Sequence, residues 1–284
     1  MKRSLGWGVV AAFCLLPACE EDAGTGSVSF TSWGEEYIEV EIPTGEFEDG
    51  YSVQFSKFLV LVGDLRVEDE AGEVAAEDTG FYLMNHVEPG VKAVTTFEGL
   101  EAKRYTLVSY QTSPASRENM TLVGGVTAAD ADMMAMNQYH AYVEGTLTAP
   151  GGMSKTFKWG FSEPTLLDEC EGERDGKLTA GVVVTEGGTD AVELTIHGDH
   201  FFYDDLQSSN AKLRGDAIFN ADADMDGAVD LTELDAVALT TLPAGQYGTG
   251  GASDVNNLGD FVRFLSRTLG HYRGEGECFV KDPP

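Results

Sequence analysis

Positive charge is scarce in this sequence: the 284 residues include 18 Lys and Arg against 48 Asp and Glu, a formal net charge of −30. Such a chain repels phosphate backbones, which argues against nucleic-acid binding. The same field attracts cations, Ca²⁺ above all. Hydrophobic residues make up 42% of the chain and charged residues 23%, which are ordinary values for a folded globular protein. Disorder along the whole chain is therefore excluded.

Long apolar runs and catalytic motifs are missing as well. The one sustained apolar stretch is residues 5–16, and no later run approaches the roughly 18 apolar residues of a membrane-spanning helix. The sequence contains neither Gly-x-Ser-x-Gly nor His-Glu-x-x-His. Residues 172–177 are one residue short of a phosphate-binding loop, and Leu178 follows where Ser or Thr is required. A non-catalytic role is therefore predicted.

The N-terminus reads as an export signal. Lys2 and Arg3 precede the apolar stretch, which ends in Leu16-Pro17-Ala18-Cys19. This ending resembles the lipobox of bacterial lipoproteins, in which a small residue precedes a cysteine that is acylated, for example with palmitate. The resemblance implies that residues 1–18 are a signal peptide, that Cys19 is the lipidation site, and that residues 19–27 are a tether to the bilayer. An ordinary signal peptide with a nearby cysteine is the alternative.

The lipobox resemblance also predicts a location. We expect a lipid-anchored protein of the bacterial cell envelope, held at the outer membrane and facing either the periplasm or the outside. The lipid bilayer is then one partner, and no feature of the sequence identifies a protein partner.

Two cysteines remain in the body of the chain. Cys170 and Cys278 form an even pair in a chain with an export signal, so we predict that they form a disulfide bond. This bond would close a loop of about 108 residues and stabilise the fold by about 4–5 kcal/mol. A pair of thiolates that binds a metal is the alternative, but no further cysteine supports it.

The hydrophobic pattern predicts a mainly β fold. Short alternating segments continue from Val28 to about Phe161, and the apolar run at residues 58–62 suits a strand buried on both faces. Two hairpins are predicted around Gly-rich turns: residues 139–147 with 156–161, and residues 182–184 with 192–197.

A helical period replaces the strand pattern after His200. Helices are predicted over residues 211–219, 231–239 and 258–269, the last ended by Gly270. We therefore predict a β-sandwich-like domain over residues 28–200, followed by a small C-terminal α-helical segment over residues 201–284.

One chemical motif is specific. Residues 222–233 match the twelve-residue pattern D-x-[DN]-x-[DN]-G-x₅-E at every required position and resemble the EF-hand family. Gly227 occupies the position that needs a positive φ, and five carboxylates in twelve residues repel one another until a cation binds. The resemblance implies a calcium site formed by Asp222, Asp224, Asp226, the Ala228 carbonyl, Asp230 and Glu233.

The EF-hand loop has no partner in the sequence. EF-hands usually occur in pairs, but residues 254–265 place Leu where two oxygen ligands are needed. A structural or low-affinity calcium site is therefore favoured over a calcium sensor. A solvated acidic loop without an ion is the alternative.

A second constellation surrounds two histidines. His197 and His200 lie within four residues of one another beside Asp199, and the alternation of residues 192–197 directs His197 away from the core. This segment could bind Cu²⁺ or Zn²⁺, with His140 and His271 completing the site. Together with Trp159-Gly160-Phe161, it resembles periplasmic copper-binding lipoproteins of the β-sandwich type. The alternative is that these histidines hydrogen-bond to nearby Asp residues and shape the end of the strand.

Two functions follow from these motifs. The first is a calcium-binding lipoprotein of the cell envelope with a binding or structural role. The second is a periplasmic copper- or zinc-binding protein or metalloenzyme that uses His197 and His200.

Overall fold

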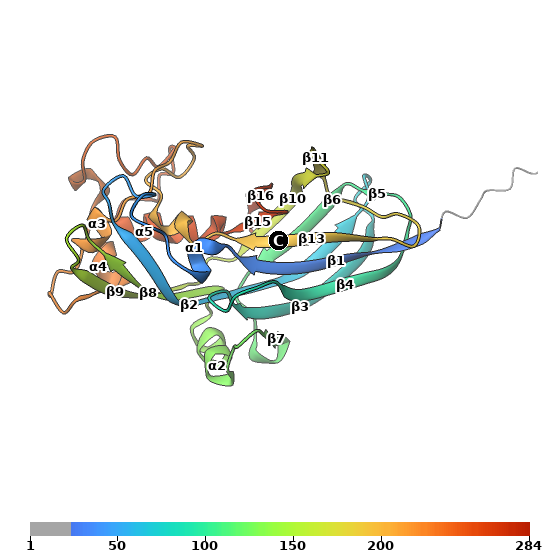
Figure 1. Cartoon of the computed structure of the whole chain (residues 1–284), viewed down its shortest axis with the longest axis horizontal. Coiled ribbons are helices and arrows are strands. Elements are labelled where there is room, and N and C mark those ends of the chain that lie inside the picture. The colour runs from blue at the N-terminus through green and yellow to red at the C-terminus, as the bar shows by residue number, and fades with distance from the viewer. Residues whose placement is uncertain (1–23) are drawn as a thin grey trace, which may run out of the picture.

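The computed structural model describes residues 24–284, so the predicted signal peptide, Cys19 and the first part of the predicted tether lie outside the described residues. The described part is mainly β with short helices, which confirms the predicted fold class at that level (Figure 1). Its longer strands are β1 (Thr25–Gly34), β2 (Ser52–Glu68), β3 (Val74–Asn85), β4 (Lys92–Glu101), β6 (Leu107–Thr112), β8 (Ala141–Thr148), β9 (Ser154–Phe161), β10 (Thr165–Arg174) and β13 (Thr189–Ile196). The shorter strands are β5 (Arg104–Tyr105), β7 (Met120–Val123), β11 (Lys177–Ala180), β12 (Val182–Val183), β14 (Ala228–Val229), β15 (Gly270–Tyr272) and β16 (Glu277–Lys281).

The helical elements are short. The α-helices are α1 (Glu36–Glu39), α2 (Ala128–Asn137), α3 (Asp216–Phe219), α4 (Leu231–Asp235) and α5 (Leu258–Leu265). Single 3₁₀ turns are η1 (Arg117–Asn119), η2 (Asp199–Phe202), η3 (Leu239–Thr241) and η4 (Ser266–Thr268). Within residues 24–284, no helix is both long enough and apolar enough to cross a bilayer.

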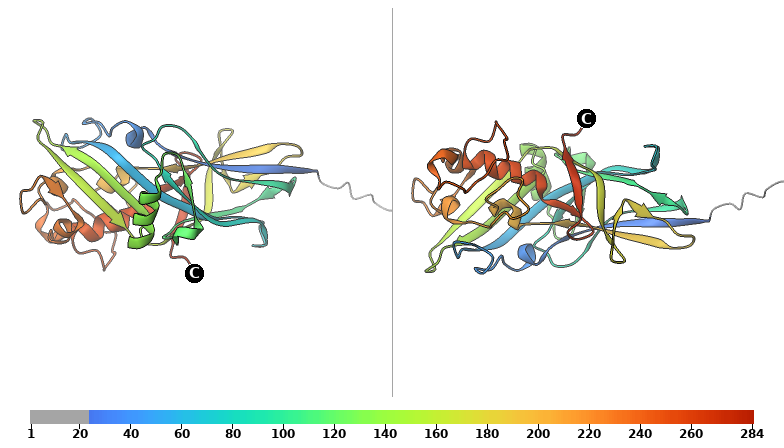
Figure 2. Two further views of the ribbon diagram at one scale, coloured as in Figure 1. Left: turned by 90° about the horizontal axis from the view of Figure 1, so that it is seen from below. Right: turned by 90° about the horizontal axis from the view of Figure 1, so that it is seen from above.

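Two large sheets provide the framework, and β5 and β12 form a separate two-stranded sheet in the described part of the chain. Within the described residues, the four-stranded sheet has the order β15-β13-β1-β4. The ten-stranded sheet follows the path β11-β10-β6-β2-β8-β9-β14, with β16 paired to β10, β3 to β2 and β7 to β3 off this path. Their apolar faces share one core, to which Phe30 of β1, Val60 of β2 and Leu265 of α5 all belong. The sheets run along the length of the molecule, and α3, α4 and α5 gather beside β8 and β9 at the end opposite the start of β1 (Figures 1 and 2).

Strand β2 is buried on both faces, as the apolar run predicts. Phe58, Val60 and Val62 belong to the core shared by the two sheets. Leu59 and Leu61 face the other way, into a smaller cluster that includes Met134 of α2. A strand with alternate residues in two cores needs apolar side chains at every position, which explains why this run does not alternate.

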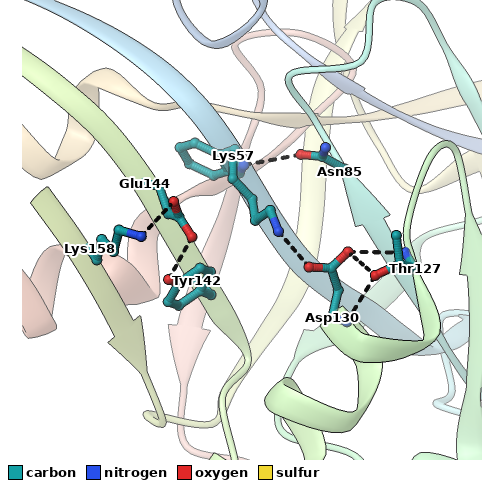
Figure 3. A network of polar contacts seen from close by, with 8 residues as sticks. Lys57, Asn85, Thr127, Asp130, Tyr142, Glu144 and Lys158 are labelled. Atoms are coloured by element: carbon teal, nitrogen blue, oxygen red, sulfur yellow. Dashed lines mark hydrogen bonds and ion pairs between the residues drawn. The ribbon is translucent and has the colours of Figure 1, made fainter. Parts of the chain in front are cut away.

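Helix α2 was not predicted from the hydrophobic pattern. It begins with a capping box, in which the Thr127 hydroxyl accepts from Asp130 N and the Asp130 carboxylate accepts from Thr127 N. The same carboxylate accepts a hydrogen bond from Lys57 Nζ at 2.6 Å, which fastens the helix to β2 (Figure 3). The signal Thr-x-x-Asp was therefore present in the sequence, although the surrounding alternation indicated strands.

One predicted hairpin is observed and the other is wrong. Strands β8 and β9 pair antiparallel over their whole length around the predicted Gly151-Gly152 turn. By contrast, β12 pairs with β5, while β13 pairs with β1 and β15, so β12 and β13 do not form a hairpin. The alternation identified both strands correctly, but pairing partners far away in sequence outcompeted the nearby one.

The predicted C-terminal helices are shorter in the structure. Residues 211–219 contribute only α3, because Leu213 instead forms β-bridges with Phe47 and Tyr203. Residues 231–239 contribute α4, whereas α5 and η4 cover residues 258–268 as predicted. The same part of the chain supplies β14, β15 and β16, which join the sheets of the β body.

The predicted disulfide bond is confirmed. Cys170 Sγ bonds Cys278 Sγ, and this bond links β10 to β16 across 108 residues of sequence. Cys170 is fully buried. Because β16 follows β15 after a tight turn closed by the Tyr272–Gly276 bridge, the bond also fastens the segment that follows His271.

Candidate metal centre

Three histidines meet where β13 and β15 pair. His197 follows β13 directly, His271 lies in β15, and His200 lies in the 3₁₀ turn η2. Thr195 pairs with His271 across the two strands, and His197 N donates to Leu269 O at 2.9 Å. The strand pairing therefore places His271 beside two histidines that are far from it in sequence.

The η2 turn is held by aromatic packing. Phe201 stacks on Phe161 with ring centroids 5.0 Å apart, and Phe202 packs against Phe157 and Trp159. All five of these phenylalanine and tryptophan side chains are buried. Fixed neighbours on this side leave His200 little freedom to turn away from the other two histidines.

The three rings form a close, buried group. Ring centroids lie 4.2 Å apart for His197 and His271, 5.0 Å for His200 and His271, and 5.5 Å for His197 and His200. One nitrogen of each ring lies within 4.8 Å of a nitrogen of both others. The residues are only 4–8% exposed. His197, which was predicted to point away from the core, is thus buried against His200 and His271.

Burial keeps two of the rings neutral. It lowers the pKa of His197 from 6.5 to about 3, and the neighbouring His271 adds to the effect. Burial also lowers the pKa of His200 well below its usual value. A neutral imidazole has one nitrogen with a free lone pair, which is the form that binds metal ions.

Thr268 determines which nitrogen of His200 is free. The Thr268 hydroxyl donates its hydrogen to Leu265 O at 2.9 Å, so it can only accept from His200 Nδ1, 2.9 Å away. Nδ1 therefore has the proton in the neutral ring, and Nε2 has the lone pair. A neighbour that fixes the tautomer of a histidine in this way is the usual outer partner of a metal ligand.

Two nitrogens of the group have no hydrogen-bond partner within the described residues. They are His197 Nε2 and His271 Nδ1, both buried. A buried polar atom without a partner is costly unless something else satisfies it. A metal ion bound between the rings would do so, and the donor set fits copper or zinc, which imidazole nitrogens favour.

Two carboxyl groups lie behind His197. β1 and β13 run parallel with Gly34 opposite Ile196, so Glu35 comes beside His197, with Oε2 3.5 Å from Nδ1. Asp199 completes a second group of three possible ligands with Glu35 and His197. Tyr203 Oη donates to Asp199 Oδ2 at 3.0 Å.

Both of these carboxyl groups resist ionisation. Burial and then the neighbouring Asp199 raise the pKa of Glu35 to about 8, and burial raises the pKa of Asp199. Glu35 is therefore protonated at pH 7. The site holds less negative charge than its carboxyl count suggests, and the histidines remain its main donors.

A pocket opens beside the three histidines. It has a volume of about 470 Å³, and His200 and His271 form part of its wall. Glu275, Glu277 and Cys278, from the turn after β15 and from β16, line the same pocket, so the disulfide bond lies beside it. The candidate centre is thus reachable from solvent although its rings are buried.

His140 does not join this group. Its ring is fully buried, with Nε2 3.4 Å from Ser266 O, and burial lowers its pKa to about 4. Neither group of possible metal ligands around His197 includes it. The sequence therefore pointed to four histidines, of which the structure brings three together.

The acidic loop folds as a tight turn around Asp222. Ligand atoms of Asp222, Asp224 and Glu233 lie within 4.8 Å of one another, whereas Asp226 and Asp230 are not in that group. Gly227 has the predicted positive φ of 83°. Asp230 and Glu233 form a capping box at the start of α4. In the described residues, β14 pairs Val229 with Phe157 of β9, which takes the place of a second EF-hand loop.

A lysine side chain lies against this loop. Lys155 Nζ is 3.0 Å from Asp222 Oδ2, and the Asp222 side chain is 2% exposed. The hydrogen bond from Lys155 lowers the pKa of Asp222, whose carboxylate also accepts from the backbone of Gly227. Lys155 therefore already pairs with the Asp222 carboxylate, which a calcium ion at this loop would need as a ligand.

Glu35 and Thr268 were missed by sequence reasoning. Glu35 is one of many acidic residues and lies far from His197 in sequence, and Thr268 is an ordinary helix-end residue. Only the β1–β13 pairing and the fold of η4 place them beside the histidines. No local motif could have found either one.

Comparison with known proteins yields little. No protein-family model matches the chain, and no curated protein matches it significantly. Among solved structures, the chain is similar to MbnP from Methylosinus trichosporium, with 12% sequence identity and a TM-score of 0.31. The match covers 63% of this chain and 77% of that one. A similarity this weak carries no argument about function.

Proposed function

We propose that this protein binds a copper or zinc ion through His197, His200 and His271 in a bacterial cell envelope. The observation that carries the proposal is the convergence of three buried imidazoles, two of which have a nitrogen without a partner. Metal–nitrogen bonds of about 2.0–2.1 Å place ligand nitrogens about 3.5 Å apart. The three nitrogens lie within 4.8 Å of one another, so the rings would have to move closer together to reach that geometry.

Neutral ligands suit this site. Because His197 and His200 have lowered pKa values, no proton has to be removed from them when a cation enters at pH 7. Thr268 contacts His200 Nδ1 and so leaves Nε2 for the metal ion. Glu35 lies beside His197 Nδ1, which leaves Nε2 of that ring for the metal ion as well. This arrangement of ligands and outer partners is typical of histidine metal sites.

The direct test is metal analysis of protein purified without a His tag. One equivalent of copper or zinc is expected, lost in His197→Gln and in His271→Gln. His140→Gln is the matched control, because His140 is equally buried but lies outside the group. Protein that takes up neither metal, or a control variant that loses the metal as well, contradicts the proposal.

The cell-envelope location rests on the lipobox resemblance at Cys19. The test is mass spectrometry of the mature protein from membranes. A mature chain that begins at Cys19 with added acyl mass is expected, and Cys19→Ser should accumulate as an unprocessed precursor. A mature chain without acyl mass contradicts the anchor.

A calcium ion at residues 222–233 is a second candidate. It is favoured by the convergence of Asp222, Asp224 and Glu233 and by the pairing of β14 with β9. Calcium here has a structural role, because it would tie α4 to the large sheet. Thermal unfolding in EDTA and in millimolar Ca²⁺ tests it: Ca²⁺ should raise the melting temperature, and Glu233→Gln should abolish the increase.

A further inference from the structure

The pocket touches two of the three histidines. His200 and His271 line it, whereas His197 does not. An ion held by all three rings would therefore have His197 on its protein side and the pocket on the opposite side. Three protein donors leave a fourth position for an outside ligand on copper or zinc, as in catalytic rather than structural sites.

The pocket walls select against anions. Asp205, Glu275 and Glu277 line the pocket, and no Lys or Arg is among its lining residues in the described part of the chain. Apolar walls come from Leu265 and Val280. Carboxylates at the rim of a partly apolar pocket favour a neutral or cationic occupant.

The volume limits the size of the occupant. About 470 Å³ holds a small molecule but is at the low end of pockets for drug-sized ligands. Of the donors that bind copper or zinc, a neutral nitrogen suits this acidic wall better than a thiolate or carboxylate, because those anions would meet like charge.

We propose that the pocket binds a small neutral or cationic molecule with an imidazole or amine nitrogen, and that this nitrogen takes the fourth position of the metal ion. The proposal rests on the proposed metal-binding function. Where the bound molecule also has an ammonium group, this group makes a second contact, a charge-assisted hydrogen bond to Glu275 or Glu277.

The test uses the full mature protein loaded with Co²⁺, whose visible spectrum reports changes in coordination. Imidazole, histamine and azide are titrated as probes: a neutral nitrogen donor, a nitrogen donor with an ammonium group, and an anion. We expect histamine to bind about tenfold more tightly than imidazole, because it adds the contact to the carboxylates. Azide should bind more weakly than imidazole.

Two variants locate the effect. Glu275→Gln combined with Glu277→Gln should remove most of the preference for histamine and leave imidazole binding unchanged. Ala211→Trp fills the pocket, so imidazole and histamine should no longer change the Co²⁺ spectrum while Co²⁺ stays bound. Ala71→Trp, at an exposed position in the loop between β2 and β3, is the control and should respond as the unaltered protein does.

The outcomes separate the two proposals. Failure to bind Co²⁺, Cu²⁺ and Zn²⁺ alike contradicts the metal site itself. Bound Co²⁺ with a spectrum that no probe alters shows a closed centre and overturns the pocket proposal alone. An unchanged response in Ala211→Trp, or tighter binding of azide than imidazole, overturns it as well.

Discussion

Thr268 holds His200 in a single tautomer: its hydroxyl donates to Leu265 O and must accept from His200 Nδ1 at 2.9 Å. The two residues lie in different elements, η4 and η2. The lone pair of His200 therefore stays on Nε2, with its direction fixed before any ion arrives. Such preorganisation lowers the cost of assembling a metal site.

Thr268→Val should weaken metal binding. The valine keeps the shape of threonine but cannot accept from Nδ1, so the His200 ring loses its orientation. We expect a loss of about tenfold or more in affinity, measured by competition with a chromophoric chelator. Thr268→Ser, which keeps the hydroxyl, should bind nearly as well as the unaltered protein. Equal affinities for all three proteins would show that Thr268 does not orient the ligand.

His86 should make the protein less stable in acid. Burial and then Lys92 lower its pKa from 6.5 to about 3, and neither ring nitrogen has a partner in the described residues. Between those pH values the unfolded state binds a proton that the folded state does not. Stability is thus lost as the pH falls below about 6.5.

The substitution His86→Leu isolates this contribution. Relative to this variant, the original protein should lose about 3 kcal/mol of unfolding free energy between pH 7 and pH 4. Urea unfolding of metal-free protein at both pH values measures the difference. The same pH dependence in both proteins would mean that His86 titrates normally in the fold.

Lys155 should oppose calcium binding. Its ammonium group lies 3.0 Å from Asp222 Oδ2, so a calcium ion must compete with this ion pair. Lys155→Met removes the charge but keeps an apolar chain against the Phe219 ring. We expect isothermal titration calorimetry to show tighter Ca²⁺ binding in Lys155→Met than in the unaltered protein. The double variant Lys155→Met, Glu233→Gln should bind no Ca²⁺. Binding unaffected by the lysine would place the ion elsewhere.

The Cys170–Cys278 bond should contribute strongly to stability. Because it closes a loop with a sequence separation of 108, the chain-entropy model predicts a loss of about 4–5 kcal/mol in the Cys170→Ala, Cys278→Ala double variant. Urea unfolding with and without a reducing agent measures it. The reducing agent should destabilise the original protein and have no effect on the variant. A variant as stable as the oxidised protein would contradict the entropic account.

Local patterns in the sequence were sufficient for several features. The β character, the doubly buried run in β2, the β8–β9 hairpin and α5 all follow from the spacing of apolar residues over a few positions. The disulfide followed from cysteine count and the export signal. Such features depend on neighbours in the chain, which a sequence displays directly.

Tertiary structure alone decided the candidate metal centre. His197 and His200 were visible as a close pair, but only the β13–β15 pairing brought His271 to them and left His140 out. Glu35 reached His197 through the parallel β1–β13 pairing, and Thr268 reached His200 through the fold of η4. Strand pairing between distant segments is selected by the packing of the whole core, so no local pattern specifies which residues it brings together.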